Sequence, residues 1–406
     1  MSSSLNEQKQ RKLLYLTSIY PTSNGTGSQL RAFSMLRMLA SRYEVYLVVI
    51  NIYQFLPGPH DAQVDAMCRE IKILKVTTQK GPQPTVEASN CIATEGWEIS
   101  PAECSQAVLQ LYQDREMDVL FVFRLQSLYA VGTTFHRFPQ RELDLDEMAS
   151  LGELTIQRLS AEMGLNIHPP RGWMKGLQTL EKIFIPKFHR VYVSSTVEIE
   201  RVKQHTGFAK AELLPNIAPS RPFLSEVPRQ NPQEILFVGK LDYLPNTDAV
   251  LWYLKEIHPL LRQAKGEGIV FRIVGYNCPA PIRAWDGRNG VEVCGYVRDL
   301  AEAYGRASLA IVPLRAGSGT RLKILEAFAY GRPVVSTTIG AEGLAVTSGK
   351  DLLLADTPED FAEACLKVLN QPALAQALIE GGLQINRDRY SEDALGRAYD
   401  QASKAS

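Results

Sequence analysis

Short, continuously apolar runs alternate along the chain with longer segments in which apolar residues recur at helical spacing. In the first half the apolar runs are Leu13–Thr17, Val45–Ile50, Ile71–Val76 and Val119–Phe123, and Gln29–Leu39 has the helical spacing. Strands that are apolar on both faces and separated by helices are typical of a parallel sheet covered on both sides. The first half is therefore predicted to be an α/β domain.

The second half repeats this alternation more clearly. Strands are predicted at Ile235–Val238, Val270–Val274, Val291–Cys294, Leu309–Val312 and Pro333–Ser336, and helices at Ala249–Gln263, Leu300–Ala307 and Leu322–Tyr330. Two more helices, each opened by a proline suited to a first turn, are predicted at Pro358–Asn370 and Pro372–Asn386. A second doubly wound α/β domain follows from this pattern.

A proline-rich segment, Ala218–Pro232, separates the halves and has neither a helical nor an alternating period. The predicted organisation is a disordered tail at residues 1–11, an N-terminal domain at 12–216, a linker at 217–232, a C-terminal domain at 233–387 and a last helix at 388–406. Ligands of open α/β sheets sit outside the carboxyl ends of the strands. A site in the cleft between two facing domains is therefore expected.

Composition narrows the classes of function. Lys plus Arg and Asp plus Glu each number 44, so the formal net charge is zero, which argues against a broad nucleic-acid surface. No apolar run approaches the length of a spanning helix, and Met1–Arg11 lacks an apolar signal core. The cysteines are scattered without a Cys-x-x-Cys pair, and the histidines show no ligand spacing. A cytoplasmic protein with reduced thiols and no metal site is predicted.

The segment Pro313–Ser336 carries the most informative chemistry. A predicted strand leads into a loop with Gly317 and Gly319, and the next helix begins near Arg321 and Lys323. Unpaired backbone N–H groups at a helix start attract anions, so glycines and two cations there predict a diphosphate cradle. Glu326, about one turn further, could accept hydrogen bonds from a ribose diol. The alternative is a glycine turn capping a surface helix with solvated cations.

The run Leu325–Ser336 resembles the signature of retaining glycosyltransferases with the GT-B fold, of the glycosyl transferases group 1 or family 4 type. Phe237–Lys240, Phe271–Gly275, Val291–Asp299 and Pro215-Asn216 resemble other family segments, in the family's order. The resemblance covers nearly the whole chain but is specific only from Glu234 to Gly343. It implies two Rossmann-like domains facing across a cleft, with the last helix crossing back onto the N-terminal domain.

The resemblance also implies residue roles. Glu326 matches the ribose-binding glutamate, and Gly319, Thr320 and Arg321 match the loop beside the donor phosphates and sugar. The other positions expected to bind the donor are Gly25, Gly27, Lys240, Gly275, Gly295, Tyr296, Val297, Gly317 and Ser318. Arg321 and Lys323 are expected to act in catalysis by stabilising the leaving diphosphate.

Two positions depart from the family pattern. Ser318 stands where the family often has a second glutamate, which reads hydroxyls of the donor sugar. Asn246 stands where a lysine is common, although Lys240 keeps one cation, and Arg321 and Lys323 are expected to compensate. A subgroup with Gly-Ser-Gly-Thr-Arg-x-Lys in this loop, associated with bacterial polysaccharide clusters, resembles the chain most.

The N-terminal side of the site is predicted from Arg141–Glu147, a predicted strand that ends in carboxylates. Asp144 and Asp146 are candidates for catalysis, binding an acceptor hydroxyl or the donor sugar, and a solvated acidic loop is the alternative. Arg124 follows a predicted strand and is a candidate for acceptor binding, or it pairs with a neighbouring acid.

Together these features predict a glycosyltransferase that moves a hexose-like group from a UDP- or GDP-sugar to an acceptor hydroxyl, with retention and without a metal or cofactor. The acceptor is expected to be a sugar, a lipid-linked or another small molecule, with no nucleic-acid partner, and peripheral membrane association is left open. Alternatives are a GT-B epimerase or phosphorylase and a catalytically silent sugar-nucleotide-binding module. The sequence does not identify the nucleobase or the sugar of the donor, the acceptor, or the oligomeric state.

Overall fold

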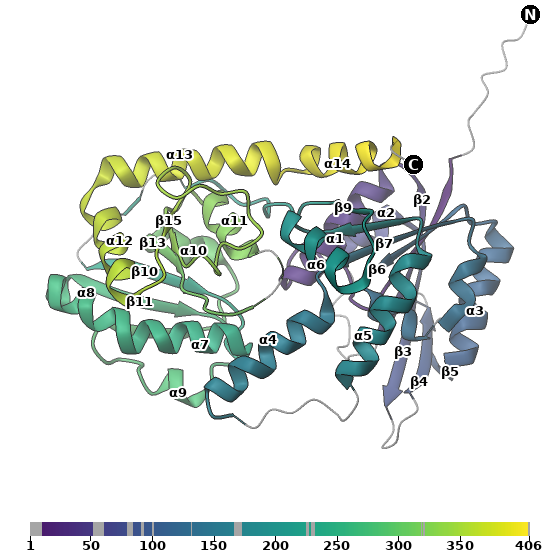
Figure 1. Cartoon of the computed structure of the whole chain (residues 1–406), viewed down its shortest axis with the longest axis horizontal. Coiled ribbons are helices and arrows are strands. Elements are labelled where there is room, and N and C mark those ends of the chain that lie inside the picture. The colour runs from purple at the N-terminus through teal and green to yellow at the C-terminus, as the bar shows by residue number, and fades with distance from the viewer. Residues whose placement is uncertain are drawn as a thin grey trace, which may run out of the picture.

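The computed structural model describes residues 10–51, 61–78, 84–90, 93–99, 101–130, 132–165, 173–224, 227–228, 232–317, 319 and 321–404. They form two α/β domains, each built around its own sheet, that lie side by side along the long axis of the molecule (Figure 1). The predicted α/β class with two largely parallel sheets is confirmed.

The N-terminal sheet has the strand order β5-β4-β3-β2-β1-β6-β7-β8-β9. Its strands are β1 (Lys12–Thr17), β2 (Glu44–Asn51), β3 (Cys68–Thr78), β4 (Pro84–Asn90), β5 (Ala93–Ile99), β6 (Val119–Phe123), β7 (Gln140–Asp146), β8 (Arg190–Val193) and β9 (Ala211–Leu213). Pairing is parallel from β3 to β9, whereas β4 and β5 extend the edge antiparallel, which the strand pattern did not predict.

Each face of this sheet has its own core. The helices of the domain are α1 (Gly27–Ala40), α2 (Ala62–Met67), α3 (Pro101–Arg115), α4 (Ala149–Glu162), α5 (Trp173–Phe184) and α6 (Thr196–Thr206), with short 3-10 turns at Leu125–Ala130, Gly132–Arg137 and Ile185–Lys187. Leu13 and Tyr15 pack toward α1 on one face, and Leu14 and Leu16 pack toward α3 and α6 on the other. Alternate side chains point to opposite faces, so a strand buried on both sides is continuously apolar.

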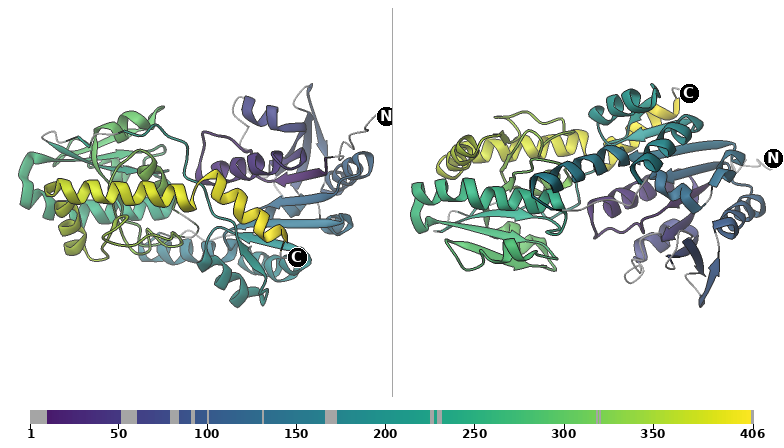
Figure 2. Two further views of the ribbon diagram at one scale, coloured as in Figure 1. Left: turned by 90° about the horizontal axis from the view of Figure 1, so that it is seen from above. Right: turned by 60° about the horizontal axis from the view of Figure 1, so that its bottom comes forward.

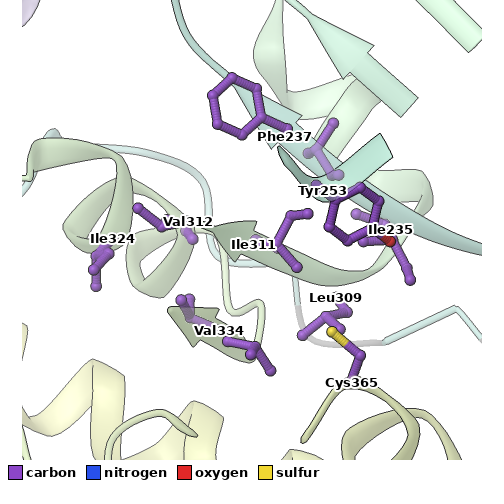
Figure 3. Packing of buried hydrophobic residues seen from close by; sticks show 14 of the residues in the cluster. Ile235, Phe237, Tyr253, Leu309, Ile311, Val312, Ile324, Val334 and Cys365 are labelled. Carbon is purple, nitrogen blue, oxygen red and sulfur yellow. The ribbon is translucent and has the colours of Figure 1, made fainter. Parts of the chain in front are cut away.

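The C-terminal sheet is parallel throughout, in the order β12-β11-β10-β13-β14-β15. Its strands are β10 (Gln233–Val238), β11 (Ile269–Val274), β12 (Val291–Gly295), β13 (Ala307–Val312), β14 (Val334–Ser336) and β15 (Leu353–Leu354). Figure 3 shows residues of this core, in which Ile235 of β10 lies beside Tyr253, and Leu309 of β13 lies near Cys365.

Helices cover this second sheet as well. They are α7 (Leu244–Trp252), α8 (His258–Lys265), α9 (Ala280–Arg283), α10 (Leu300–Arg306), α11 (Leu322–Ala329), α12 (Pro358–Asn370) and α13 (Pro372–Arg389), with a 3-10 turn at Gly266–Gly268. The helix predicted at Ala249–Gln263 begins earlier, at Leu244, and passes through a π-helical turn at Tyr253–Ile257 before α8.

The chain passes between the domains after β9 and again after α13. Between β9 and β10, the described residues contain no helix or strand, and Ala218 N–H donates to Tyr390 O at 2.7 Å, where α13 ends. From there α14 (Glu392–Lys404) lies over the N-terminal domain, next to α1 (Figures 1 and 2). Tyr399 of α14 donates to the fully buried Glu142 at 3.0 Å. The described residues include no helix that is long and apolar enough to cross a membrane.

Candidate active site

The predicted diphosphate loop leaves the carboxyl end of β13 and leads into α11. Gly317 and Gly319 have φ of 135° and 71°, values that favour glycine. Ser318 and Thr320, both predicted to bind the donor, lie outside the described residues. Arg321 is the N-cap residue of α11, is only 6% exposed, and its guanidinium donates to Gly319 O. The loop is thus held against the start of the helix by its own cation.

Lys323, in the first turn of α11, places its ammonium at the end of β10. Its Nζ donates to Asn246 Oδ1 at 2.7 Å and lies 4.4 Å from the ring centroid of Phe237. A Cβ on Gly239 would lie 3.1 Å from the same nitrogen. The ammonium of Lys323 therefore reaches the position of Asn246 from α11, and its compensation for the missing lysine stays a prediction.

Burial destabilises the charged forms of both Arg321 and Lys323. Desolvation lowers the pKa of Arg321, and desolvation together with the charge of Arg321 lowers the pKa of Lys323 to about 7. Removing a cation from water penalises the charged form unless an opposite charge compensates it. Two such cations at the start of one helix therefore form a place where an anionic ligand would be stabilised.

Glu326 is buried on the same helix and pairs with the interdomain segment. Its Oε1 accepts from Arg221 Nε at 3.1 Å and from Nη2 at 2.9 Å. Burial raises the pKa of Glu326, and Arg221 opposes that shift. Among the described residues, nothing donates a hydrogen bond to Oε2 of Glu326. This oxygen can therefore accept a hydrogen bond from a ribose hydroxyl, as predicted for Glu326.

A pocket of about 490 Å³ lies at the carboxyl ends of β11 and β12. Gly275, Tyr276, Gly295 and Tyr296 contribute to its lining. A Cβ on Gly275 would lie 1.8 Å from Gly239 O, so packing alone requires this glycine. Gly295 has φ of 67°, and Tyr296 is 70% exposed. Gly295 and Tyr296, which are predicted to contact the nucleobase, thus both line this pocket.

Two other residues predicted to bind the donor, Lys240 and Val297, follow the carboxyl ends of β10 and β12. Val297 is partly buried against the C-terminal core. The Nζ of Lys240 lies 3.4 Å from Asp242 Oδ1 with 43% of its side chain exposed, and its backbone oxygen accepts from Asn246. Lys240 is therefore the more exposed of the two predicted lysines.

The glycine loop of the N-terminal domain meets the start of α11. Gly27 is the first residue of α1, and a Cβ on it would lie 3.2 Å from Cδ1 of Leu322. A Cβ on Gly25 would lie 2.6 Å from Gln29 Oε1, whose side chain closes a capping box with Thr26. Any side chain at Gly25 would thus displace the cap of α1.

A buried ionic network lies beneath this loop. Asp144 is fully buried and pairs with Arg31 of α1 through contacts of 2.7 and 3.0 Å. Arg31 also donates to Asn216 Oδ1 at 2.9 Å. Burial raises the pKa of Asp144, and Arg31 counteracts this. The geometry gives Asp144 a supporting position in the interior of the N-terminal domain.

Asp146 and Arg124 are more exposed than this buried pair. Arg124 Nη2 donates to Asp146 Oδ2 at 2.6 Å and to Ser28 Oγ at 2.7 Å. Both residues have positive φ, 63° for Arg124 and 62° for Asp146, an uncommon conformation that is often found at functional sites. The pair therefore connects the end of β7 to the first turn of α1.

The structure thus brings together, at the junction of the domains, Gly27, Arg124, Asp146, Gly317, Gly319, Arg321, Lys323 and Glu326. Gly275, Gly295 and Tyr296 line the pocket at the edge of the C-terminal sheet, and Asp144 is withdrawn into the Arg31 network. Arg221, Glu147 and Asn216 were not among the predicted site residues. An arginine in a proline-rich linker carries no signal of its own, and Glu147 was indistinguishable from its acidic neighbours.

Residues 232–371 match the family model described as glycosyl transferases group 1, which confirms the predicted resemblance to this family over that part of the sequence. An uncharacterized 44.6 kDa protein in the cps region of Klebsiella pneumoniae is 29% identical over 137 residues. That match covers 32% of this chain and 35% of the other protein, so the chain spans about a third of the length of this relative.

Solved structures are similar over nearly the whole chain. TarM has a TM-score of 0.71 at 10% identity, covering 98% of this chain and 99% of TarM, and a mutant of TarM from S. aureus matches as well. Sucrose-phosphate synthase from Thermosynechococcus elongatus has a TM-score of 0.69 at 16% identity over 98% and 100% of the chains. HepE from Anabaena has 0.64 at 13% identity, with the same coverage. At these identities the likeness establishes the shared two-domain fold.

Proposed function

We propose that this chain, which carries a glycosyl transferases group 1 domain, transfers a sugar from a UDP-sugar to an acceptor hydroxyl with retained anomeric configuration and without a metal ion. The observation that carries the proposal is the composition of the first turns of α11. Arg321 and Lys323 are desolvated cations beside a glycine loop, and one turn further on Glu326 presents a carboxylate oxygen to which no described residue donates. This order of charges matches a diphosphate followed by a ribose.

The pocket at the ends of β11 and β12 suits the base of the same nucleotide. Its exposed aromatic residues, Tyr276 and Tyr296, offer faces for a planar ring. Uridine is favoured as the nucleoside because HepE was solved in complex with UDP, with UDP and glucose, and with UDP-glucose, and TarM in complex with UDP. The donor would then span from this pocket to the start of α11.

Catalysis would come from charge stabilisation at the leaving group. As the bond between the anomeric carbon and the phosphate oxygen breaks, negative charge grows on the diphosphate. Arg321, Lys323 and the backbone N–H groups of α11 would stabilise this charge more in the transition state than in the ground state. The acceptor oxygen forms the new bond on the same face of the sugar, and its proton passes to the departing phosphate oxygen.

The N-terminal domain would position the acceptor. Arg124 and Asp146 lie at the carboxyl edge of its sheet, beside the glycine loop that contacts Leu322. A carboxylate accepts hydrogen bonds from hydroxyls, and a guanidinium donates them, so the pair suits a polyhydroxylated acceptor. A sugar, free or lipid-linked, has this chemistry.

The test measures UDP release from a panel of UDP- and GDP-sugars, with and without oligosaccharide acceptors, in the presence of EDTA. Release that depends on an acceptor, with an NMR spectrum showing the donor's anomeric configuration in the product, is the expected result. A requirement for a divalent cation or an inverted product would overturn those parts of the proposal. Epimerisation of the donor without an acceptor, or binding without any turnover, would replace it with the epimerase or the silent binding module.

A further inference from the structure

Glu147 of the N-terminal domain reaches across to the predicted diphosphate loop of the C-terminal domain. A Cβ on Gly319 would lie 2.8 Å from Glu147 Oε2 and 3.6 Å from its Cδ. Glu147 follows β7 and precedes α4, and about a quarter of its side chain is exposed. A carboxylate from one domain is thus in close approach to the backbone of the loop in the other.

Two arginines lie close to the Glu147 carboxylate. Its Oε1 lies 3.9 Å from Arg124 Nη2, and its negative charge opposes the lowering of the Arg321 pKa that desolvation causes. An ionised carboxylate can only accept hydrogen bonds, and it repels phosphate oxygens. Beside a diphosphate site, its suitable ligand is therefore a neutral group that donates hydrogen bonds, such as the hydroxyls of a sugar.

A chain of hydrogen bonds and ion pairs connects Met148, the residue after Glu147, to the C-terminal domain. The N–H of Met148 donates to Glu198 Oε2 at 3.1 Å, and Glu198 Oε1 accepts from Arg201 at 2.6 Å. Arg201 in turn donates to both carboxylate oxygens of Glu342 in the C-terminal domain, at 3.0 Å each. The residue directly after Glu147 is therefore tied to the same domain that Glu147 contacts.

We propose that Glu147 determines donor-sugar specificity: its carboxylate, presented from the N-terminal domain against Gly319, accepts hydrogen bonds from hydroxyls of the transferred sugar. The proposal rests on the proposed function of the site. Ser318, next to Gly319 in sequence, has no carboxylate, so recognition of these hydroxyls comes from the opposite domain. Only the sugar, and not the nucleoside diphosphate, depends on this contact.

The experiment compares Glu147→Ala and Glu147→Gln with the wild type. Calorimetry measures UDP affinity, and steady-state kinetics measures KM and kcat over UDP-sugars that are epimers of one another. Glu162→Ala is the control, because Glu162 lies in the adjacent α4 and pairs with Arg158 on an exposed face. A hydrogen bond to a charged group is worth about tenfold to a hundredfold in binding.

For Glu147→Ala we expect an increase of about tenfold or more in the KM of the preferred donor, reduced discrimination between epimers, and UDP affinity within about twofold of the wild type. Glu147→Gln keeps one carbonyl acceptor, so its KM and its discrimination between epimers should lie between those of Glu147→Ala and the wild type. Glu162→Ala should match the wild type. An equal loss for UDP and donor, unchanged discrimination, or a loss of kcat at unchanged KM in Glu147→Gln would overturn the proposal. Wild-type protein that turns over none of the donors would instead count against the proposed function.

Discussion

One carboxylate oxygen of Glu326 accepts two hydrogen bonds from Arg221, from Nε at 3.1 Å and from Nη2 at 2.9 Å. Arg221 belongs to the segment between the two domains, whereas Glu326 lies in the helix that begins at the predicted phosphate site. The residue expected to bind the nucleotide is therefore oriented by the interdomain segment. Because both bonds from Arg221 go to Oε1, they set the position of Oε2 without using it.

The first prediction concerns the hydroxyl ligand. Glu326→Ala should weaken UDP binding by about 1.5–3 kcal/mol, because a charged acceptor is lost. Arg221→Ala should cause a smaller loss, because Glu326 remains but is less well oriented, and its pKa rises further without the arginine. Calorimetry with UDP on folded variants measures both. If both variants bind UDP as the wild type does, Glu326 has no part in nucleotide recognition.

The second prediction distinguishes a structural role of Asp144 from a catalytic one. Asp144→Ala should lower the free energy of unfolding by about 3–5 kcal/mol, because it leaves the buried Arg31 without its partner. Replacing the pair together, as Arg31→Met with Asp144→Leu, should recover part of that loss. Urea denaturation measures each effect. A stable Asp144→Ala protein with normal unfolding and no turnover would show that Asp144 acts in the reaction itself.

The hydrophobic pattern predicted the two domains because their central strands are buried on both faces. The apolar runs at Val119–Phe123 and Ile235–Val238 have no polar alternation, and they became β6 and the greater part of β10. The antiparallel strands β4 and β5 lacked this signal, because residues such as Glu87 and Glu98 interrupt the apolar period. Antiparallel strands need not be covered by helices on both faces, so a continuous apolar run is not required of them.

The candidate site divides in the same way between local and distant contributions. Gly317, Arg321 and Glu326 were predictable because one continuous segment carries them, and helix geometry fixes the relative positions of the last two. Their partners come from distant segments. Arg221 lies 105 positions before Glu326, and Glu147 reaches Gly319 from the opposite domain. Such contacts exist only once segments far apart in the sequence have folded against each other, so no local pattern predicts them.

The third prediction concerns the ion pair between the domains. Arg201 and Glu342 are each about 30% exposed, so solvent screens the pair and its loss should cost no more than about 1 kcal/mol of stability. Arg201→Ala should nevertheless loosen the arrangement of the domains, because the two hydrogen bonds from α6 to Glu342 are then lost. Small-angle scattering should show a larger radius of gyration than for the wild type, and high salt should shift the wild type toward the variant. Identical scattering at low and high salt for both proteins would contradict this role.

The last prediction uses the titration of Lys323. Burial and the nearby Arg321 lower its pKa to about 7, so in the free protein it loses its proton just above neutral pH. A bound diphosphate favours the charged ammonium and raises that pKa. Above pH ~7 the protein must therefore take up a proton in order to bind, and affinity falls as pH rises, by up to about tenfold per pH unit. Below pH ~7 the ammonium is already charged, and affinity should be constant.

A UDP-sugar is the right ligand for this measurement, because its diphosphate is a diester and keeps its charge across neutral pH. Calorimetry from about pH 6 to about pH 9 should show the fall for the wild type. Lys323→Arg should flatten the profile, because a guanidinium stays protonated throughout, and Lys323→Met should bind weakly at every pH without the fall. A flat wild-type profile, or a fall that persists in Lys323→Arg, would mean that Lys323 does not meet the diphosphate. The anion would then have to be held by Arg321 and the backbone of α11, with Lys323 bonded to Asn246 as a structural group.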